Sequence, residues 1–118
     1  MKVLIVEDDA DMRRLLKIVV ESLNAETQEA EDGETAIRII ENGDNPDLVL
    51  LDLHLPNVSG DEVLDKIREH CNNCIVVVVT ADVFAASGFI EKVDGVFTKP
   101  FKTKELLVKI SSLLGRRA

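Results

Sequence analysis

The chain has 118 residues, of which 46% are hydrophobic and 31% charged, a balance that suits one compact domain over residues 1–118. Its 22 acidic and 14 basic residues give a net charge of −8, which repels polyanions and disfavours direct binding of nucleic acid. No apolar run approaches the length of a membrane span, and the start MKVLIVEDD lacks the features of a signal peptide. We therefore expect a soluble, cytoplasmic protein without a membrane partner.

In the first half of the chain, short apolar runs alternate with segments of helical period. Residues 2–6 (KVLIV) predict a strand, and the segment that follows places its apolar residues on one helical face. A weak strand over residues 27–30 precedes a second helix, which Asn42 and Gly43 should end. Residues 48–53 (LVLLDL) are apolar except for one aspartate, as expected for a central strand buried on both faces.

The second half continues the same alternation. Ser59 should cap a third helix, and residues 75–79 (IVVVV) predict another fully buried strand. The fourth helix must lie within residues 83–93, where small residues and a Ser-Gly pair weaken helical propensity. A short strand over residues 95–98 precedes a final helix, which we expect to end at Gly115.

Five strands that each precede a helix favour an α/β fold of the doubly wound type. Strands that are apolar on both faces imply a parallel sheet with helices on both sides and right-handed crossovers. In such sheets the functional crevice lies at the carboxyl ends of the strands. The residues just after each strand are therefore the candidates for function.

Those strand ends carry acids, a hydroxyl and a lysine: Glu7, Asp8 and Asp9 after the first strand, Asp52, Thr80 and Lys99. Carboxylates on one rim repel each other unless a cation neutralises them, and oxygen ligands select a hard cation such as Mg²⁺. Lys99 and Thr80 would suit the oxygens of a phosphoryl group in transfer. Asp52 would be the nucleophile that forms an aspartyl phosphate.

Each of these residues also has a structural explanation. Asp9, taken alone, is better explained as a helix cap, and Thr80 or Lys99 alone could be an ordinary surface residue. Asp52 is different, because a carboxylate inside an apolar strand carries a large desolvation penalty. Their joint placement favours the functional interpretation.

Cys71 and Cys74 form an isolated Cys-Asn-Asn-Cys motif. A tetrahedral zinc would need two more ligands, for which only His54 and His70 are available. No second ligand pair at metal spacing accompanies the motif, so a redox role is also disfavoured. We interpret the pair as two reduced thiols in a loop.

The sequence resembles the receiver domain of two-component response regulators. The resemblance extends from Val3 to Leu114 and is carried by four segments. The matching segments are VLIVEDD, LVLLDLHLPNVSG, VVVVTAD and VFTKPF. The resemblance implies a flavodoxin-like (βα)5 fold with five parallel strands in the order 2-1-3-4-5. It also implies a phosphorelay protein that takes a phosphoryl group from a histidine kinase or phosphotransfer protein and controls a downstream effector domain or protein. Such a domain catalyses its own phosphorylation and dephosphorylation and is not a dedicated enzyme.

The resemblance also assigns roles residue by residue. Asp52 would be phosphorylated, and Mg²⁺ would be bound by Asp8, Asp52, the backbone carbonyl of His54, and Glu7 either directly or through a metal-bound water. Thr80 would move to hydrogen-bond the phosphoryl group, and Lys99 would pair with one of its oxygens. His54 and Asp82 occupy variable positions that influence how fast the phosphoryl group is lost.

Two departures from the family pattern bear on output. The family's switch aromatic falls on Val96, whereas the neighbouring Phe97 should point to the other face of the strand. Thr80 and Lys99 are only 19 positions apart, a few fewer than is common in the family. We predict ordinary phosphorylation chemistry, a short or irregular fourth helix and an unusual output surface; homodimerisation stays open.

Three other functions fit the residues less well than the phosphorylation switch. A phosphohydrolase of the haloacid-dehalogenase type would carry an acid where this chain has His54, and would need room for a substrate cap. A flavin binder would need a phosphate-binding loop after the first strand and an aromatic stack, but the chain has no Trp and no Tyr. An interaction module that is never phosphorylated would not need Asp8, Asp52, Thr80 and Lys99 together.

Overall fold

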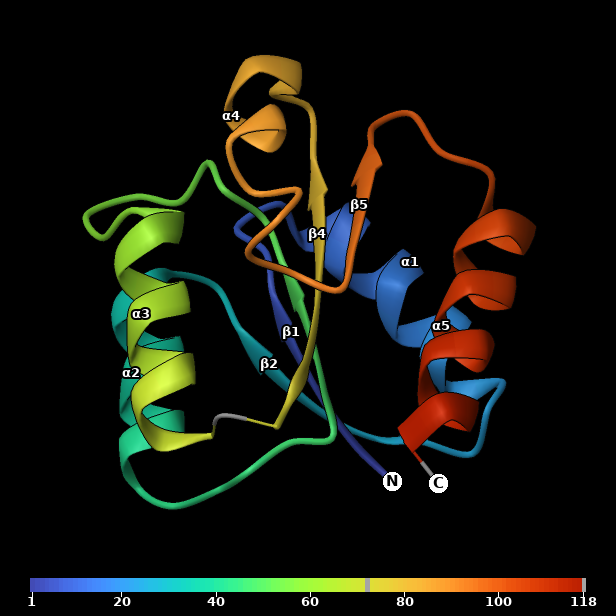
Figure 1. Cartoon of the computed structure of the whole chain (residues 1–118), viewed down its shortest axis with the longest axis horizontal. Coiled ribbons are helices and arrows are strands. Elements are labelled where there is room, and N and C mark those ends of the chain that lie inside the picture. Colours follow the sequence, from blue (N-terminus) through green and yellow to red (C-terminus); the bar gives the residue numbers. More distant parts are fainter. Residues whose placement is uncertain (72, 118) are drawn as a thin grey trace.

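The computed structural model describes residues 1–71 and 73–117, and its described part is a five-stranded sheet with helices on both faces (Figure 1). All neighbouring strands are parallel, in the order β2-β1-β3-β4-β5. The strands are β1 (Lys2–Val6), β2 (Glu26–Ala30), β3 (Leu48–Leu51), β4 (Ile75–Thr80) and β5 (Gly95–Thr98). The helices are α1 (Ala10–Glu21), α2 (Gly33–Glu41), α3 (Gly60–His70), α4 (Val83–Ser87) and α5 (Thr103–Arg117). The flavodoxin-like fold and its strand order are confirmed.

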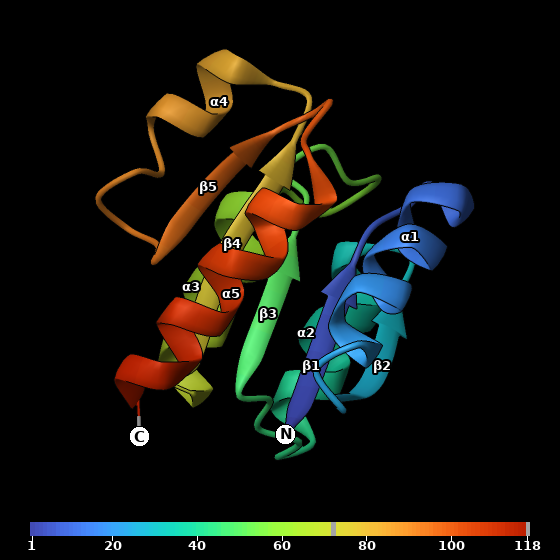
Figure 2. The same ribbon diagram turned by 90° about the vertical axis from the view of Figure 1, so that its right-hand side faces the viewer.

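The sheet divides the core into two layers, with α2 and α3 on one face and α1 and α5 on the other (Figures 1 and 2). Alternation along β1 supplies both layers, since Leu4 packs with the α2–α3 side and Ile5 with the α1–α5 side. Every residue of β3 and β4 is buried. This agrees with the continuous apolar runs expected of central parallel strands.

The helix starts follow from side-chain capping. Asp9, Asp32, Ser59 and Asp82 have extended backbone angles, and each accepts hydrogen bonds from the first turn of the helix that follows it. The capping role expected of Ser59 is confirmed. At the other end of α2, Gly43 has a φ of 85°, a left-handed conformation that glycine adopts without strain.

The predicted end of the last helix at Gly115 is wrong, because α5 continues through it to Arg117. Among the described glycines only Gly43 has a positive φ, so Gly115 does not take the left-handed conformation that terminates a helix. Even α5, with 15 residues, is too short to cross a bilayer, and the other described helices are shorter.

The fourth helix is short, as predicted. α4 has five residues and is followed by Gly88, after which turns lead to β5. Its packing against the core is slight, because Ala86 is its one buried residue and Phe84 is 91% exposed. The region between Thr80 and Lys99 therefore leaves much apolar surface in solvent.

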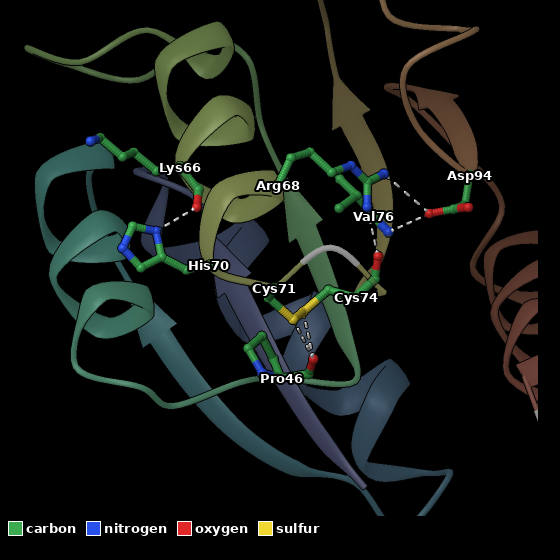
Figure 3. Close-up of a disulfide and its surroundings, with 8 residues drawn as sticks. All are labelled: Pro46, Lys66, Arg68, His70, Cys71, Cys74, Val76 and Asp94. Atoms are coloured by element: carbon green, nitrogen blue, oxygen red, sulfur yellow. Dashed lines mark hydrogen bonds and ion pairs between the residues drawn. A yellow bond between two sulfur atoms is a disulfide. The ribbon is translucent and has the colours of Figure 1, made fainter.

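The interpretation of Cys71 and Cys74 as reduced thiols is also corrected: the structure joins them in a disulfide (Figure 3). Cys71 leaves the helical conformation at the end of α3, with a φ of −148°. Cys74 directly precedes β4, and its Cα atom lies 5.5 Å from that of Cys71. That separation is typical of disulfide-bonded pairs.

Candidate functional site

Backbone hydrogen bonds at the carboxyl edge of the sheet bring the predicted site residues together. The amide of Glu7 donates to the Ala30 carbonyl (3.0 Å), and the amide of Asp52 donates to the Val6 carbonyl (3.0 Å). On the other side, the Lys99 amide donates to the carbonyl of Thr80 (2.8 Å). The ends of β1, β3, β4 and β5 therefore hold these residues along one edge.

Three carboxylates form the centre of this site. One oxygen from each of Glu7, Asp8 and Asp52 lies within 4.8 Å of the others. Glu7 is 1% and Asp52 is 6% exposed, whereas Asp8 is open to solvent. A hard cation that prefers oxygen ligands and keeps several waters, such as Mg²⁺, fits this donor set and its open side.

Lys99 supplies the positive charge of the site. Its Nζ donates to Glu7 Oε1 (2.5 Å) and to Asp52 Oδ2 (3.2 Å). Burial opposes the charged form of Lys99, but the hydrogen bond to Glu7 and the two carboxylate charges outweigh it and raise the pKa of the lysine. Lys99 therefore remains a cation that bridges the two buried acids.

Among the acids of the site, Glu7 is the one whose negative charge is destabilised by burial. Burial raises its pKa to about 7 from an ordinary value of 4.5, and the negative charge of Asp52 adds to the rise. The hydrogen bonds from Lys99 and from the amide of Asp9 act in the opposite direction. Near neutral pH, Glu7 thus exchanges between an acid and a carboxylate unless another cation arrives.

Asp52 has hydrogen-bond donors at both carboxylate oxygens. The His54 amide donates to Oδ1 (3.1 Å), and Lys99 holds Oδ2. The side chain is thus fixed in the pocket formed with Glu7. The residue predicted to be the nucleophile thus lies beside a cation and two further acids.

Thr80 and His54 line the rim in different ways. Thr80 is fully buried, and its Oγ1 accepts a hydrogen bond from the amide of Asp82 (3.3 Å). The His54 imidazole is largely exposed, and its Nε2 lies 2.6 Å from Asp82 Oδ2. The same Asp82 caps α4, so this contact ties the loop after β3 to the start of α4.

Asp9 is directed away from the acid cluster. Its carboxylate accepts from the amides of Asp11 (2.9 Å) and Met12 (3.3 Å) at the start of α1. The helix cap expected for Asp9 is confirmed, and it explains why this third acid lies outside the group formed by Glu7, Asp8 and Asp52.

One supporting residue, Arg13, was not predicted from the sequence. Its guanidinium donates from Nη1 to the Glu7 carbonyl (2.8 Å) and from Nε to Glu29 Oε1 (3.2 Å). Arg13 therefore holds the backbone at the end of β1 from the side of α1. The signal in the sequence was an arginine placed one helical turn after the acidic residues.

Val96 and Phe97 point to opposite faces of β5, as predicted. Val96 packs with the core on the α2–α3 side, and Phe97 packs with the core on the α1–α5 side. The aromatic ring of Phe97 thus lies across the sheet from the position that the family's switch aromatic would occupy. That position is occupied by Val96, which has a small aliphatic side chain.

Comparison with known proteins identifies a family. A model of the response regulator receiver domain matches residues 3–111. The transcriptional regulatory protein ResD of Bacillus subtilis is 37% identical over 118 residues, which cover 98% of this chain and 48% of ResD. The chain thus spans about half the length of the curated relatives that it matches.

Solved structures agree with this assignment. The signal receiver domain of a putative Luxo repressor protein from Vibrio parahaemolyticus is 33% identical, with a TM-score of 0.86 over 98% of this chain and 90% of the other. The response regulator protein TrrA from Thermotoga maritima, solved in complex with Mg²⁺ and a beryllium fluoride, is 33% identical. Its TM-score is 0.85 over 95% of this chain and 97% of TrrA.

The chain therefore belongs to the response regulator receiver domain family. Its fold and its pocket of Glu7, Asp8 and Asp52 are those of a signalling switch, not of a dedicated enzyme.

Proposed function

We propose that residues 1–118 form one receiver domain that acts in the cytoplasm as the phosphoacceptor of a two-component system. A histidine kinase or phosphotransfer protein donates a phosphoryl group, and Asp52 accepts it. The observation that carries the proposal is the position of the Asp52 carboxylate, which is 6% exposed and hydrogen-bonded to Lys99 beside two further acids.

Mg²⁺ is the cofactor that the donor set favours. Asp8, Asp52 and the backbone carbonyl of His54 would bind it, with Glu7 acting directly or through a metal-bound water. When bound, Mg²⁺ would add to the positive charge of Lys99 beside the three carboxylates and would neutralise charge on a phosphoryl group. The beryllium fluoride complex of TrrA with Mg²⁺ supports a site of this kind.

The protein's own residues would then carry the transfer. A carboxylate oxygen of Asp52 attacks phosphorus, and the bond between phosphorus and the donor breaks, so the donor leaves with the bonding electrons. Lys99, which now bridges Glu7 and Asp52, would pair with a phosphoryl oxygen. The hydroxyl of Thr80 would release the Asp82 amide and turn toward the phosphoryl group.

The output would follow from that rearrangement. Asp82 contacts Thr80 through its amide and caps α4 with its carboxylate, so a shift at Thr80 bears directly on the start of α4. The loops around Thr80 and Val96 would thus move between two arrangements and control a downstream effector domain or protein. The curated relatives are transcriptional regulators about twice as long as this chain, which supports an effector outside residues 1–118.

The test is the intact mass of the protein after incubation with acetyl phosphate, with and without Mg²⁺. We expect wild type to gain one phosphoryl group only when Mg²⁺ is present, and Asp52→Asn to gain none. Asp65→Asn, which removes an exposed acid from α3, is the matched control and should be phosphorylated like wild type.

A failure would be informative. If no adduct forms while Mg²⁺ binding is shown separately and rapid hydrolysis is excluded by rate measurement, the switch proposal is overturned. A constitutive interaction module would then be the better account.

A further inference from the structure

The second chemically distinctive group lies at the opposite edge of the sheet from the phosphoacceptor pocket. Cys71 follows α3, and Cys74 immediately precedes β4 (Figure 3). Both are nearly buried, with Cys71 7% and Cys74 2% exposed. Nothing in the phosphorylation chemistry uses this pair.

The surroundings of the two sulfur atoms suit both a disulfide and a pair of thiols. The carbonyl oxygen of Pro46 lies 2.8 Å from Cys74 Sγ and 3.7 Å from Cys71 Sγ. A disulfide has no proton to donate, but in the reduced form the Cys74 thiol would donate to that carbonyl. The reduced form therefore gains a hydrogen bond where the oxidised form gains a covalent link.

Arg68 connects this corner with the segment that leads into β5. Its Nη1 donates to the Cys74 carbonyl (2.9 Å), and its Nη2 donates to the Lys92 carbonyl (3.2 Å) and lies 3.6 Å from Asp94 Oδ2. Asp94 Oδ2 also accepts from the Val76 amide in β4 (2.8 Å). The position of the Cys74 carbonyl thus helps to determine how the guanidinium holds residues 92–94, as Figure 3 shows for Arg68 and Asp94.

We propose that Cys71 and Cys74 form a reversible redox modification site, oxidised by a low-molecular-weight disulfide, and that its oxidation state controls through Arg68 how firmly residues 92–94 are held. In the oxidised form the covalent link fixes Cys74, and with it the Cys74 carbonyl, to the end of α3. In the reduced form Cys74 is held to Cys71 by weaker contacts, so the guanidinium loses part of its support. Residues 92–94 lie between α4 and β5, the region whose motion the proposed function requires.

The reaction balances with oxidised glutathione as the oxidant. The thiolate of Cys71, the less buried of the two, attacks one glutathione sulfur, which gives a mixed disulfide and releases one glutathione thiolate. The Cys74 thiolate then attacks the Cys71 sulfur and releases the second glutathione. The protein loses two electrons, the oxidant gains them, and the two thiol protons pass to the released thiolates.

The expected cellular compartment favours a reversible role over a structural one. Disulfides are rare in the reducing cytosol, and those that form there in mesophiles are usually transient, catalytic or redox-sensing. This step alone rests on the proposed cytoplasmic function. The measurements below use no phosphodonor, so their outcome is separate from that of the phosphorylation test.

The first experiment equilibrates the whole chain in a series of glutathione redox buffers, traps free thiols with N-ethylmaleimide, and counts the labels by intact mass. We expect molecules with either two labels or none, and a single two-electron transition that runs equally in both directions. Cys74→Ala should instead accumulate a mixed disulfide on Cys71. The proposal would be overturned if the protein carried two labels in every buffer, or if the two thiols were labelled independently. It would also be overturned if the most reducing buffers left the disulfide of the folded protein intact.

The second experiment measures hydrogen–deuterium exchange across residues 88–95 in the oxidised and reduced forms. Oxidation should slow exchange there several-fold in wild type. Arg68→Gln should abolish that difference, while its two thiols are still oxidised and reduced as a pair. Arg14→Gln, on the exposed side of α1, is the matched control and should keep the wild-type difference. Equal exchange in the two wild-type forms, or a difference that persists in Arg68→Gln, would overturn the link through Arg68.

Discussion

The two ends of the parallel strands differ in how their charged side chains are balanced. The carboxyl edge holds the phosphoacceptor pocket, and the amino edge holds Arg68 and the disulfide. At the carboxyl edge, Lys99 bridges two buried acids, and the pKa of Glu7 rises to about 7. At the amino edge, Arg68 meets neutral carbonyl oxygens and one partly exposed acid, Asp94, so its charge needs no further partner. The carboxyl edge therefore carries an excess of negative charge that a bound cation can neutralise. At the amino edge the charge of Arg68 is already balanced, and its contacts hold residues 92–94 in place.

Removal of the positive charge from the carboxyl edge should have the largest effect. Lys99→Met leaves Glu7 and Asp52 without a counter-charge, so we expect a loss of about 2 to 3 kcal/mol in the free energy of unfolding at pH 8. At pH 6 the loss should be smaller, because a protonated Glu7 no longer repels Asp52. Urea unfolding of the metal-free protein at the two pH values measures both.

Lys102→Met is the control for that variant, because it removes an exposed lysine from the loop before α5. Its stability should stay within experimental error of wild type. If the two variants lose the same stability, Lys99 does not offset an excess of negative charge at the carboxyl edge.

Neutralising Glu7 should act in the opposite direction. Since its pKa is about 7 in the fold against an ordinary 4.5, the folded protein binds more protons than the unfolded chain between these pH values. The contribution of Glu7 to stability is therefore fully present below pH 4.5 and is lost as pH rises through 7. Glu7→Gln should remove this slope and stabilise the metal-free protein by roughly 1 to 2 kcal/mol at pH 8.

The same variant should bind Mg²⁺ more weakly, because an amide replaces one of the acids. Thermal unfolding from pH 5 to pH 8, with and without Mg²⁺, would show both effects. Glu21→Gln, an exposed substitution at the end of α1, should keep the wild-type slope. A stability profile for Glu7→Gln that is parallel to wild type would contradict the burial argument.

The sequence predicted the parts of the fold that depend on local pattern. β3 and β4 are continuous apolar runs, as strands of a parallel sheet with two buried faces should be. The short α4 followed from the separation of 19 positions between Thr80 and Lys99, and small residues in that segment weaken its helical propensity. The end of α5 was placed wrongly at Gly115 because this glycine does not take the left-handed conformation of a helix-terminating glycine, and composition does not reveal φ.

Contacts between distant loops were beyond the sequence. The strand-end rule gathered Glu7, Asp52 and Lys99 correctly, and their roles in phosphorylation stay predictions. The contact between His54 and Asp82 spans 28 positions and needs the exact placement of two loops. The disulfide depends on where α3 ends, and no periodicity fixes that within the one or two residues required.

At the amino edge, loss of Arg68 should destabilise the protein less than loss of Lys99. Arg68→Gln removes two hydrogen bonds to carbonyls and the contact with Asp94, but it leaves no buried charge unpaired. We expect a loss of about 1 kcal/mol in the free energy of unfolding, nearly equal at pH 6 and pH 8. If Arg68→Gln lowers the free energy of unfolding as much as Lys99→Met does, and with the same dependence on pH, the two edges do not differ in charge balance.

The smallest effect should come from Asp82, where the carboxyl edge meets α4. Asp82 Oδ1 accepts from the Ala85 amide (2.9 Å) and Oδ2 contacts His54, and these bonds hold the pKa of this carboxyl below its ordinary value. Asp82→Asn keeps an oxygen for the cap, whereas Asp82→Ala removes both cap and charge. Amide exchange at Ala85 should therefore accelerate in Asp82→Ala and change little in Asp82→Asn. Equal acceleration in both variants would show that the charge facing His54, and not the cap, holds α4 to the site.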